Sequence, residues 1–411
     1  MLSKLLIEQV IDSQKERLTQ LNPGLKREIS GINDLTTHAL IVTGIRRCGK
    51  STLLQQINKS ISDQTLYLNF EDPRLTGFDQ GDFNRLHEIA VTRGIFIFLF
   101  DEIQLVDRWE GFIRFRLDEG YRVYITGSNA SMLSRELGTK LTGRHISKEL
   151  FPFSYYEYLS FTGQNRDAIS ADRYMHVGGF PEMVKTNMPE VLMNLFNDIL
   201  ICDIAVRYSV KNISSLQQLA VWLISNSGKQ ITGNSLKKVF SIGSSSSIME
   251  YLFYFSNAWL FFFVPKFSYS HKVQIVNPKK VYAIDNGLIE SNSTSFSNDT
   301  GRLLENMVYM ELRRRTDEIY YFNAEKECDF AVFNKGKLAG LYQVCLQIGS
   351  DNLNRELAGL KAAMDFFKVK KGTIITQNQT DSFTIDGKII SAIPFYNWAA
   401  GDRLYAEGRR L

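Results

Sequence analysis

Five short runs of apolar and β-branched residues, each of strand length, occur within the first 155 residues of the chain. These runs are Ala39–Thr43, Thr65–Phe70, Ile95–Phe100, Tyr121–Thr126 and His145–Leu150. Segments with helical periodicity separate them. Continuous apolar runs that alternate with helices are typical of a parallel sheet buried on both faces. The pattern therefore predicts an α/β domain over residues 1–155.

The next part of the chain shows helical periodicity and no clear strand signal. It runs from Tyr155 to Tyr208 and is interrupted at Gly178-Gly179-Phe180-Pro181. Glycine and proline end helices, so we expect several helices here instead of one. We interpret residues 156–210 as a helical lid or connector.

Three closely spaced helical segments and then two strand-like runs follow. They are Ser214–Asn226, Gly233–Phe240, Ser244–Asn257, Trp259–Val264 and Lys280–Ile284. Three helices followed by a β-hairpin are the arrangement of a winged helix. The order predicts a winged-helix-like segment over residues 211–290.

The last part of the chain begins with a serine- and asparagine-rich stretch, Ser291–Asp299, which is typical of a surface linker. After it we expect a helix, three strands, a second helix and a final strand. They lie at Gly301–Thr316, Ile319–Phe322, Cys328–Phe333, Leu338–Ile348, Asn354–Phe367 and Gly372–Thr376. This pattern predicts a small α/β domain over residues 291–411.

The composition is that of an ordinary globular protein of two or three domains, with 411 residues, 44% of them hydrophobic. The net charge of +4 is too small to indicate nucleic acid or an anionic membrane by itself. The four cysteines form no CxxC pair and the five histidines are widely scattered, so neither a disulfide framework nor a zinc site is indicated. The most apolar stretch, Tyr251–Pro265, is too short to span a bilayer. We expect a soluble, cytoplasmic protein without a membrane partner.

The first functional motif lies between the run ALIVT and the helical segment STLLQQI. Its sequence, GIRRCGKS, matches the phosphate-binding pattern GxxxxGK[ST]. The glycines let backbone N–H groups turn toward phosphates, and the start of the helix adds its positive end. Lys50 then neutralises the β- and γ-phosphates of ATP, and the Ser51 hydroxyl is a ligand for Mg²⁺. The predicted phosphate-binding residues are Gly44, Ile45, Arg46, Arg47, Cys48, Gly49, Lys50, Ser51 and Thr52.

The second motif is a fully apolar run, IFIFLF, which ends in two carboxylates. A carboxylate at the carboxyl end of a parallel strand lies in the crevice where ligands bind. We therefore expect Asp101 to hold Mg²⁺ through water and Glu102 to act as the general base toward the attacking water. The alternative is that the two acidic residues only cap a strand.

A polar turn follows the next predicted strand, at Gly127-Ser128-Asn129. Parallel strands end at the same edge of the sheet, so Ser128 or Asn129 can orient the lytic water and sense the γ-phosphate. A plain serine/asparagine turn is the alternative. One predicted strand separates the phosphate loop from the acidic pair in sequence. This additional strand, together with the position of Glu102 beside Asp101, is typical of ATPases that activate water with their own carboxylate. It argues against kinases and GTPases.

At this point the sequence resembles the bacterial and archaeal AAA-type ATPases that carry a C-terminal domain of unknown function. The motifs that carry the resemblance are the phosphate loop, Asp101-Glu102-Ile103-Gln104, Trp109, Ile125-Thr126-Gly127-Ser128, Leu141-Thr142-Gly143-Arg144, Phe151-Pro152-Phe153-Ser154, Gly178-Gly179-Phe180-Pro181-Glu182, Tyr282-Ala283-Ile284-Asp285-Asn286-Gly287-Leu288, Glu305-Asn306-Met307-Val308-Tyr309 and Glu327-Cys328-Asp329-Phe330. They span nearly the whole chain. The resemblance implies ATP binding, Mg²⁺ and hydrolysis.

The resemblance also singles out Arg144, which is suited to contact the γ-phosphate either in its own chain or across a subunit boundary. A planar, permanently charged guanidinium matches a developing phosphoryl charge. Arg144 can equally pair with a carboxylate. Of Arg46 and Arg47 inside the loop, we expect one to face the phosphates and the other to face solvent.

The C-terminal part is similar in pattern to the restriction-endonuclease-like fold. Glu305 and Asp329 stand where that fold has its carboxylates, whereas Gln343 and Cys345 replace the acidic residue and the lysine of its last element. A thiol supplies no fixed positive charge, and a glutamine oxygen is a weaker metal ligand than a carboxylate. We interpret this part as a degenerate nuclease-like domain, with nuclease activity not expected.

DNA binding is weakly supported. The would-be recognition helix, Ser244–Asn257, contains no lysine or arginine, although phosphate neutralisation supplies most non-specific affinity. Lys237-Lys238, Arg313-Arg314-Arg315 and Arg409-Arg410 can form a basic face or can be solvated surface. The aromatic residues between Tyr251 and Phe263 are expected to be core.

The sequence thus predicts an α/β, AAA-type P-loop ATPase with a helical lid, a winged-helix-like segment and a nuclease-like C-terminal domain. Its reaction is ATP plus water to ADP plus phosphate. The alternatives are a nucleotide-gated switch or scaffold with little turnover, and a DNA-processing ATPase. A homo-oligomer is possible, and the sequence identifies no protein partner.

Overall fold

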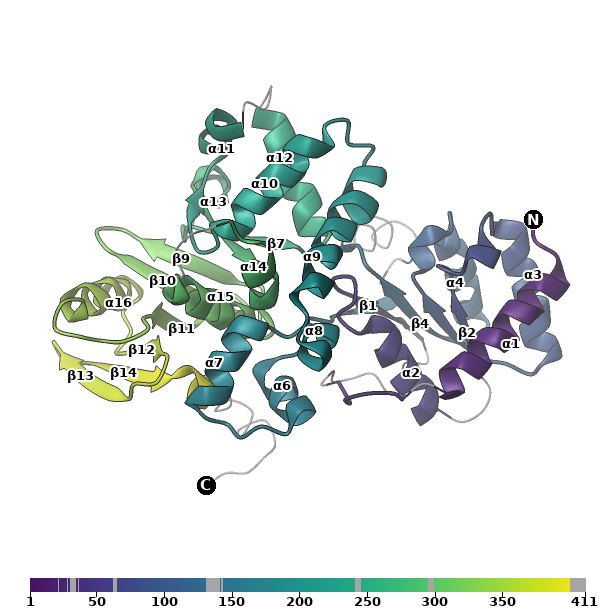
Figure 1. Ribbon diagram of the computed structural model, residues 1–411, viewed down its shortest axis with the longest axis horizontal. Coiled ribbons are helices and arrows are strands. Elements are labelled where there is room, and N and C mark those ends of the chain that lie inside the picture. The colour runs from purple at the N-terminus through teal and green to yellow at the C-terminus, as the bar shows by residue number, and fades with distance from the viewer. Residues whose placement is uncertain are drawn as a thin grey trace. The chain divides into compact units, whose positions relative to one another are not determined.

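The computed structural model describes residues 1–20, 22–27, 29, 35, 37–61, 65–130, 141, 143–240, 245–294 and 299–399. The chain divides into two compact units. The N-terminal unit is Met1–Phe151 with Asn257–Trp259, and the C-terminal unit is Pro152–Ser256 with Leu260–Leu411. The boundary between the units thus lies four residues before residue 155, the predicted end of the first domain. The predicted subdivision of residues 156–411 stays a prediction. Figure 1 shows the elements of both units along the chain.

The N-terminal unit contains a five-stranded, fully parallel sheet in the order β2-β3-β4-β1-β5. The strands are β1 Ala39–Thr43, β2 Thr65–Asn69, β3 Ile97–Asp101, β4 Arg122–Gly127 and β5 His145–Glu149. All five were predicted, with ends that differ by at most two residues. The longer helices of this unit are α1 Lys4–Gln20, α2 Lys50–Ser60, α3 Gln80–Thr92 and α4 Trp109–Asp118. The predicted parallel α/β core is confirmed.

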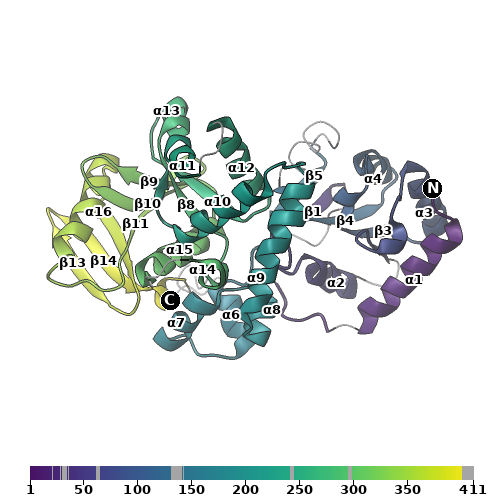
Figure 2. The same cartoon turned by 45° about the horizontal axis from the view of Figure 1, so that its top comes forward.

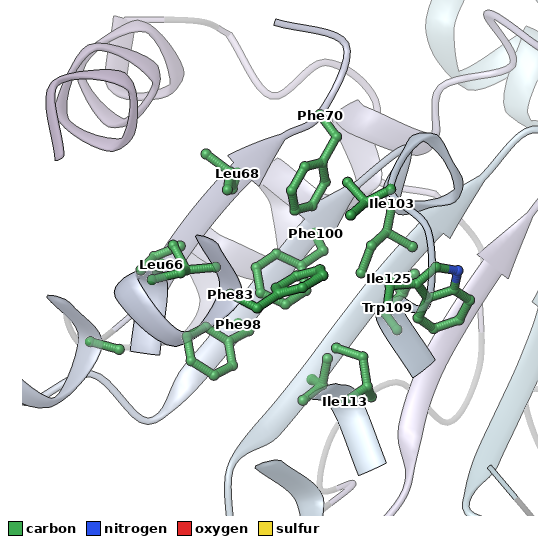
Figure 3. Close-up of a cluster of buried hydrophobic side chains, with 14 of the residues drawn as sticks. Leu66, Leu68, Phe70, Phe83, Phe98, Phe100, Ile103, Trp109, Ile113 and Ile125 are labelled. Carbon is green, nitrogen blue, oxygen red and sulfur yellow. The ribbon is translucent and has the colours of Figure 1, made fainter. Parts of the chain in front are cut away.

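The aromatic core on one face of this sheet explains how β3 presents its carboxyl end. Phe98 and Phe100 of β3 point into the cluster drawn in Figure 3, together with Phe83 of α3 and Ile113 of α4. Because side chains alternate along a strand, Leu99 and Asp101 point to the opposite face. That face is covered by α2, which contacts both β3 and β4. The packing thereby aims Asp101 toward the start of α2.

The C-terminal unit begins with helices, as expected from Tyr155 to Tyr208. They are α6 Tyr155–Thr162, α7 Ala168–Val177, α8 Pro181–Thr186, α9 Pro189–Asp198 and the π-helical continuation Ile199–Val206. Gly178 ends α7 with φ of +74°, and Pro181 opens α8. Both breaks follow from the conformational limits of these two residue types.

The next elements match the predicted three helices and hairpin. They are α10 Ile213–Ser225, β6 Gln230–Ile231, α11 Gly233–Phe240, α12 Ser245–Asn257, β7 Phe261–Pro265, α13 His271–Val276 and β8 Lys279–Ala283. The strands form an antiparallel sheet in the order β6-β8-β7. Neither β6 nor α13 was predicted, because each is too short to show a period. The winged-helix interpretation itself stays a prediction.

The chain continues through α14 Asn286–Asn292 and α15 Thr300–Arg313 into a mixed, six-stranded sheet in the order β13-β14-β12-β11-β10-β9. Its strands are β9 Ile319–Asn323, β10 Glu327–Asn334, β11 Lys337–Val344, β12 Lys371–Thr376, β13 Asp381–Ile385 and β14 Lys388–Pro394. Helix α16, Leu353–Phe367, packs its apolar side on one face (Figure 2). The predicted α/β domain is present.

One element prediction in this domain was wrong, because the strand at Gly372–Thr376 is not the last. Two further strands, β13 and β14, form an antiparallel hairpin. Their turn contains Asp386 and Gly387, both with positive φ, and Asp-Gly between alternating apolar residues is a hairpin signal that was overlooked. Among the residues that the structure describes, no helix is both long enough and apolar enough to cross a bilayer.

Candidate nucleotide-binding site

The loop between β1 and α2 requires glycine at two positions. A Cβ on Gly44 would lie 2.1 Å from the Leu150 carbonyl oxygen, so no larger residue fits. Gly49 has φ of +106°, which side-chain-bearing residues rarely adopt. Ile45 and Cys48 are fully buried beneath the loop, and the Cys48 thiol donates to the Leu150 carbonyl at 3.3 Å. Buried side chains thus fix the loop against the sheet, and the backbone N–H groups of the loop can bind a ligand.

Lys50, the first residue of α2, lies inside this loop. Its side chain is 4% exposed, and Nζ lies 3.1 Å from the Gly44 carbonyl oxygen and 3.4 Å from Glu102 Oε1. Burial opposes its charge, yet the neighbouring Glu102 carboxylate keeps the pKa of Lys50 above the ordinary value. Lys50 is therefore a cation at the place where the motif predicts the β- and γ-phosphates.

Asp101 is held by hydroxyl groups from three elements. Thr126 Oγ1 donates to Asp101 Oδ1, the Tyr67 hydroxyl donates to Oδ2 at 2.8 Å, and the Ser51 hydroxyl is also hydrogen-bonded to this carboxylate. Burial and the charge of Glu102 raise the pKa of Asp101. The predicted metal ligands, Ser51 and Asp101, are thus brought together. A carboxylate and a hydroxyl offer the oxygen ligands that Mg²⁺ prefers, so these residues fit the ion.

Glu102 begins the turn after β3 with φ of +53°, a conformation that is uncommon for residues other than glycine. Its backbone N–H donates to Thr126 Oγ1 at 3.1 Å, and its carboxylate accepts from Gln104 and is hydrogen-bonded to Ser128. Burial disfavours the charge of Glu102, but Lys50 and these donors bring its pKa below the ordinary value. Glu102 is therefore an ionised proton acceptor at neutral pH.

Ser128 and Asn129 follow β4, which lies between β1 and β3 in the sheet. Both are 3% exposed, and Ser128 Oγ lies 3.3 Å from Gln104 Nε2. The strand order thus places them between the phosphate loop and Glu102, at the edge of the sheet where the motif was expected. Gln104, Thr126 and Tyr67 were not predicted as site residues, although Gln104 and Thr126 lie in motifs that carried the family resemblance.

Two further loop residues border the site or an adjacent hollow. Arg46 Nη2 lies 3.1 Å from Glu71 Oε1, two residues after β2, and the Arg46 charge helps to lower the pKa of Glu102. Ser51 and Thr52 line a hollow of about 450 Å³ that is also bordered by Gln14 and Arg17 of α1. The hollow adjoins the Ser51 side of the site.

Comparison with known proteins identifies the family of the chain. The model of the AAA domain family matches residues 36–159, and that of a domain of unknown function matches residues 169–298. An uncharacterized protein of Methanocaldococcus jannaschii is 33% identical over 431 residues, which cover 96% of this chain and 95% of the relative. The chain belongs to the AAA-type P-loop ATPase family.

Two further kinds of similarity accompany this assignment. An uncharacterized protein of Haemophilus influenzae is 29% identical over 381 residues, covering 87% of this chain and 93% of the relative. Among solved structures, the Thermotoga maritima RuvB Holliday junction branch migration motor is 14% identical, with a TM-score of 0.29, 64% of this chain covered and 88% of that one. Cdc6p from Pyrobaculum aerophilum is 13% identical, with a TM-score of 0.26, 73% of this chain covered and 95% of that one. At these TM-scores the structural likenesses carry no part of the assignment.

Arg144 is not brought to the phosphate loop of this AAA domain. It precedes β5, and its carbonyl oxygen accepts from the Ala39 N–H at the amino end of β1. The phosphate loop follows the other end of β1. The Arg144 guanidinium is 49% exposed and pairs with Asp118 at the end of α4. Within one chain, Arg144 therefore takes the second of its two predicted roles, pairing with a carboxylate.

Arg27, by contrast, touches the phosphate loop and was not predicted. Its guanidinium is buried and donates to the carbonyl oxygens of Cys48 at 2.7 Å and Phe151 at 2.6 Å. These bonds tie the back of the loop to the segment after β5. Arg27 lies 17 residues before Gly44, the first residue of the phosphate-binding motif. No local sequence pattern links the two, so the sequence alone does not predict the contact.

The candidate DNA-contacting arginines are engaged within the C-terminal unit. Arg314 donates to the Phe153 carbonyl oxygen at 3.2 Å, Arg313 lies over the Phe262 ring, and Arg315 lies over the Trp398 ring. Arg409 and Arg410 lie outside the described residues. The arginine run at the end of α15 is therefore occupied by packing, and of the predicted basic runs Lys237-Lys238 remains on α11.

The nuclease-like positions do meet in space. Glu305 of α15 and Asp329 of β10 both contact Lys280, and Gln343 of β11 accepts from the Asp329 N–H at 3.3 Å. The Gln343 amide nitrogen donates to Glu356 at 3.0 Å. Burial raises the pKa of the Cys345 thiol, which therefore supplies no charge. The nuclease-like fold itself stays a prediction.

Proposed function

We propose that this AAA protein binds ATP with Mg²⁺, hydrolyses ATP to ADP and phosphate, and couples its nucleotide state to its C-terminal unit. The observation that carries the proposal is the convergence of Lys50, the Ser51–Asp101 pair and an ionised Glu102 at the carboxyl edge of one parallel sheet. That edge is where α/β sheets bind ligands.

Each residue has a distinct part in the proposed reaction. The loop N–H groups and Lys50 bind the β- and γ-phosphates, and Ser51 with Asp101 would hold Mg²⁺, which neutralises phosphate charge when bound. Glu102 accepts a proton from the water whose oxygen attacks the γ-phosphorus. The bond from that phosphorus to the ADP oxygen breaks, and ADP leaves. Ser128 and Asn129 are placed to orient the water.

The pairing of Lys50 with Glu102 suggests how binding and chemistry are linked. The two side chains share a buried ion pair of 3.4 Å. A triphosphate competes for the Lys50 ammonium, because phosphate oxygens carry more negative charge than one carboxylate. Binding ATP therefore releases Glu102 toward water. The same ion pair, with the bonds from Gln104 and Ser128, favours a second candidate function in which Glu102 stays clamped and ATP acts as a switch with little turnover.

The test separates binding from turnover. Lys50→Ala should weaken ATP binding at least about 10-fold. Glu102→Gln removes the carboxylate that competes for Lys50, so it should bind ATP at least as tightly as the wild type and lose roughly 10²-fold or more in phosphate release. Lys59→Ala is a matched control, because Lys59 is exposed on the same helix α2. Equal, near-zero phosphate release from wild type and Glu102→Gln would favour the switch. Absence of saturable ATP binding in the wild type would overturn both functions.

The DNA-processing alternative has less support. Helix α12 carries no lysine or arginine, and its exposed side chains include Met249 and Phe253. A helix that approaches the DNA backbone needs cationic side chains, because neutralisation of the phosphates supplies most of the non-specific affinity. Phosphate release measured with and without duplex DNA should therefore be the same.

A further inference from the structure

An internal lysine lies at the centre of an acidic cluster in the C-terminal unit. The Lys280 ammonium lies 3.1 Å from Glu305 Oε1, 2.8 Å from Glu327 Oε1 and 2.9 Å from Asp329 Oδ1. The lysine side chain is 4% exposed. A lysine this deeply buried is rare unless it is paired.

The match between donors and acceptors is one to one. An ammonium group has three N–H donors, and each carboxylate of the cluster offers it one oxygen. Burial opposes the charge of Lys280, but Asp329 and its acidic neighbours keep the pKa of Lys280 well above the ordinary value. The cluster therefore already contains a full, permanent cation.

The other carboxylate oxygens are largely occupied by neutral donors. Glu327 Oε2 accepts from Gln230 at 2.8 Å, and Asp329 Oδ2 accepts from the Val344 N–H at 3.0 Å. Glu305 Oε1 accepts a second bond, from the Tyr282 hydroxyl at 2.6 Å. These bonds hold the carboxylates in the positions that suit the ammonium.

The same positions do not suit a divalent cation. The oxygens lie 2.8–3.1 Å from the lysine nitrogen, whereas Mg²⁺ needs oxygen ligands at about 2.0–2.1 Å and a shell of about six of them. To bind such an ion, each carboxylate would have to give up its bond to Lys280 and move inward by nearly 1 Å, so the ammonium and the ion exclude each other. Consistently, the described part of the chain contains no group of three acidic, histidine or cysteine side chains placed to hold a metal ion.

We propose that Lys280 is the built-in cation of this acidic centre, and that it closes the centre to divalent cations while fastening β8 to α15 and β10. The centre then acts as a buried salt-bridge network that stabilises the packing of β8 against α15 and β10, and not as a metal-dependent reaction centre. This inference is independent of the ATPase function. The network links residues on both sides of position 290, which belong to one compact unit.

The test is thermal unfolding with Mn²⁺ alone as the probe, without nucleotide. All chains carry Asp101→Asn, which removes the other carboxylate proposed to hold a metal. With Lys280 present, Mn²⁺ should leave the unfolding temperature unchanged. Lys280→Ala should lower that temperature by about 5 °C or more, and Mn²⁺ should restore part of the loss, because the carboxylates then lack their cation. Adding Asp329→Asn should abolish the restoration.

Lys279→Ala is the matched control, because Lys279 is the neighbouring lysine of β8 and its side chain lies on the other face of the strand. It should unfold like its parent and give no Mn²⁺ response. If Lys280→Ala does not fold, electron paramagnetic resonance of Mn²⁺ added to the chain with Lys280 decides, and absence of Asp329-dependent binding supports the proposal. Asp329-dependent Mn²⁺ binding with Lys280 in place would overturn it. So would a Lys280→Ala chain that is destabilised without any Mn²⁺ response, or one as stable as the Lys279→Ala control.

Discussion

At the scale of single residues, the hydroxyl of Thr126 connects the two carboxylates that follow β3. It donates to Asp101 and accepts from the backbone N–H of Glu102 at 3.1 Å. Thr126 is fully buried, so water cannot replace either bond. The proposed metal ligand and the proposed base are therefore positioned by one fully buried side chain.

Thr126→Val tests this positioning role, because valine keeps the shape of threonine and removes the hydroxyl. We expect a loss of about 1–3 kcal/mol in the free energy of unfolding. Phosphate release should fall about 10-fold or more while ATP affinity stays within a few-fold, since the misplaced groups act on the chemical step. Thr126→Ser, which keeps the hydroxyl, should retain most activity. Unchanged turnover in Thr126→Val would contradict the role.

The sequence predicted those site residues whose position follows from local pattern. Lys50 and Ser51 begin a helix after a glycine loop, and Asp101 and Glu102 end an apolar strand, so strand–loop–helix order suffices to place them. Thr126, Arg27 and Lys280 act through contacts with residues that lie 21 or more positions away along the chain. Their partners depend on strand order and helix packing, which a single sequence does not specify.

At the scale of elements, two glycine-containing motifs of the C-terminal unit form a close-packed joint. The Gly179 N–H donates to the Asp285 carboxylate at 2.6 Å, and its carbonyl oxygen accepts from the Phe153 N–H at 2.7 Å. A Cβ on Gly287 would lie 2.3 Å from the Val177 carbonyl oxygen. These motifs, which helped to identify the family, thus join α7, α8 and α14 by backbone contact.

Gly178→Ala measures how tightly this joint is packed. A Cβ at Gly178 would lie 2.2 Å from Asp285 Oδ1, whereas one at Gly336 would meet no atom within 4 Å. Gly178 also combines φ of +74° with ψ of −164°, a backbone conformation that is essentially restricted to glycine, so alanine there adds backbone strain to the clash. We expect Gly178→Ala to lower the free energy of unfolding by roughly 1–3 kcal/mol more than Gly336→Ala. If chemical denaturation shows the same loss of unfolding free energy for both variants, the packing at Gly178 adapts to the added methyl group at little cost.

The same joint should make stability depend on pH. Burial raises the pKa of Asp285 from 3.8 to about 6, although backbone N–H groups oppose the shift. The folded chain therefore holds this proton to higher pH than the unfolded chain does. The resulting stabilisation is full below about pH 3.8 and is lost as the pH rises through about 6.

Asp285→Asn removes this titration and keeps an acceptor oxygen. Between about pH 4.5 and about pH 7.5, the free energy of unfolding of the wild type should fall by roughly 2 kcal/mol relative to that of Asp285→Asn. Denaturant titrations of both chains at the two pH values provide the measurement. A stability difference that does not change with pH would contradict the raised pKa.

Helices and strands were predicted correctly where the apolar pattern extended over enough residues to be recognised. The five parallel strands and α10, α11 and α12 showed clear patterns, and the predicted ends differ little from the observed ones. The two-residue strand β6 spans one strand period, and the six-residue helix α13 is shorter than two helical turns. They exist because β8 supplies hydrogen bonds to β6 and because the chain must return from β7 to β8.

At the scale of the whole molecule, the place of Arg144 bears on assembly. It lies at the amino end of the sheet, and the phosphate loop lies beyond the carboxyl end of β1, about 16 Å away along a five-residue strand. That separation exceeds the length of an arginine side chain. Arg144 is also half exposed, with only the exposed Asp118 as its ion-pair partner in the described part of the chain. If it contacts a γ-phosphate, the phosphate belongs to a second copy.

A mixing experiment tests whether Arg144 acts between copies. Lys50→Ala lacks the phosphate-binding lysine but keeps Arg144, and Arg144→Ala has the reverse defect, so each alone should release little phosphate. In a head-to-tail assembly formed from equal amounts of both, about one interface in four joins an intact site to an intact arginine, and the mixture should recover about a quarter of wild-type turnover. Asp118→Asn, which frees Arg144 without removing it, should keep full turnover. Arg144→Ala with normal turnover, or a mixture that stays inactive although light scattering shows mixed oligomers, would exclude a role for Arg144 across the subunit boundary.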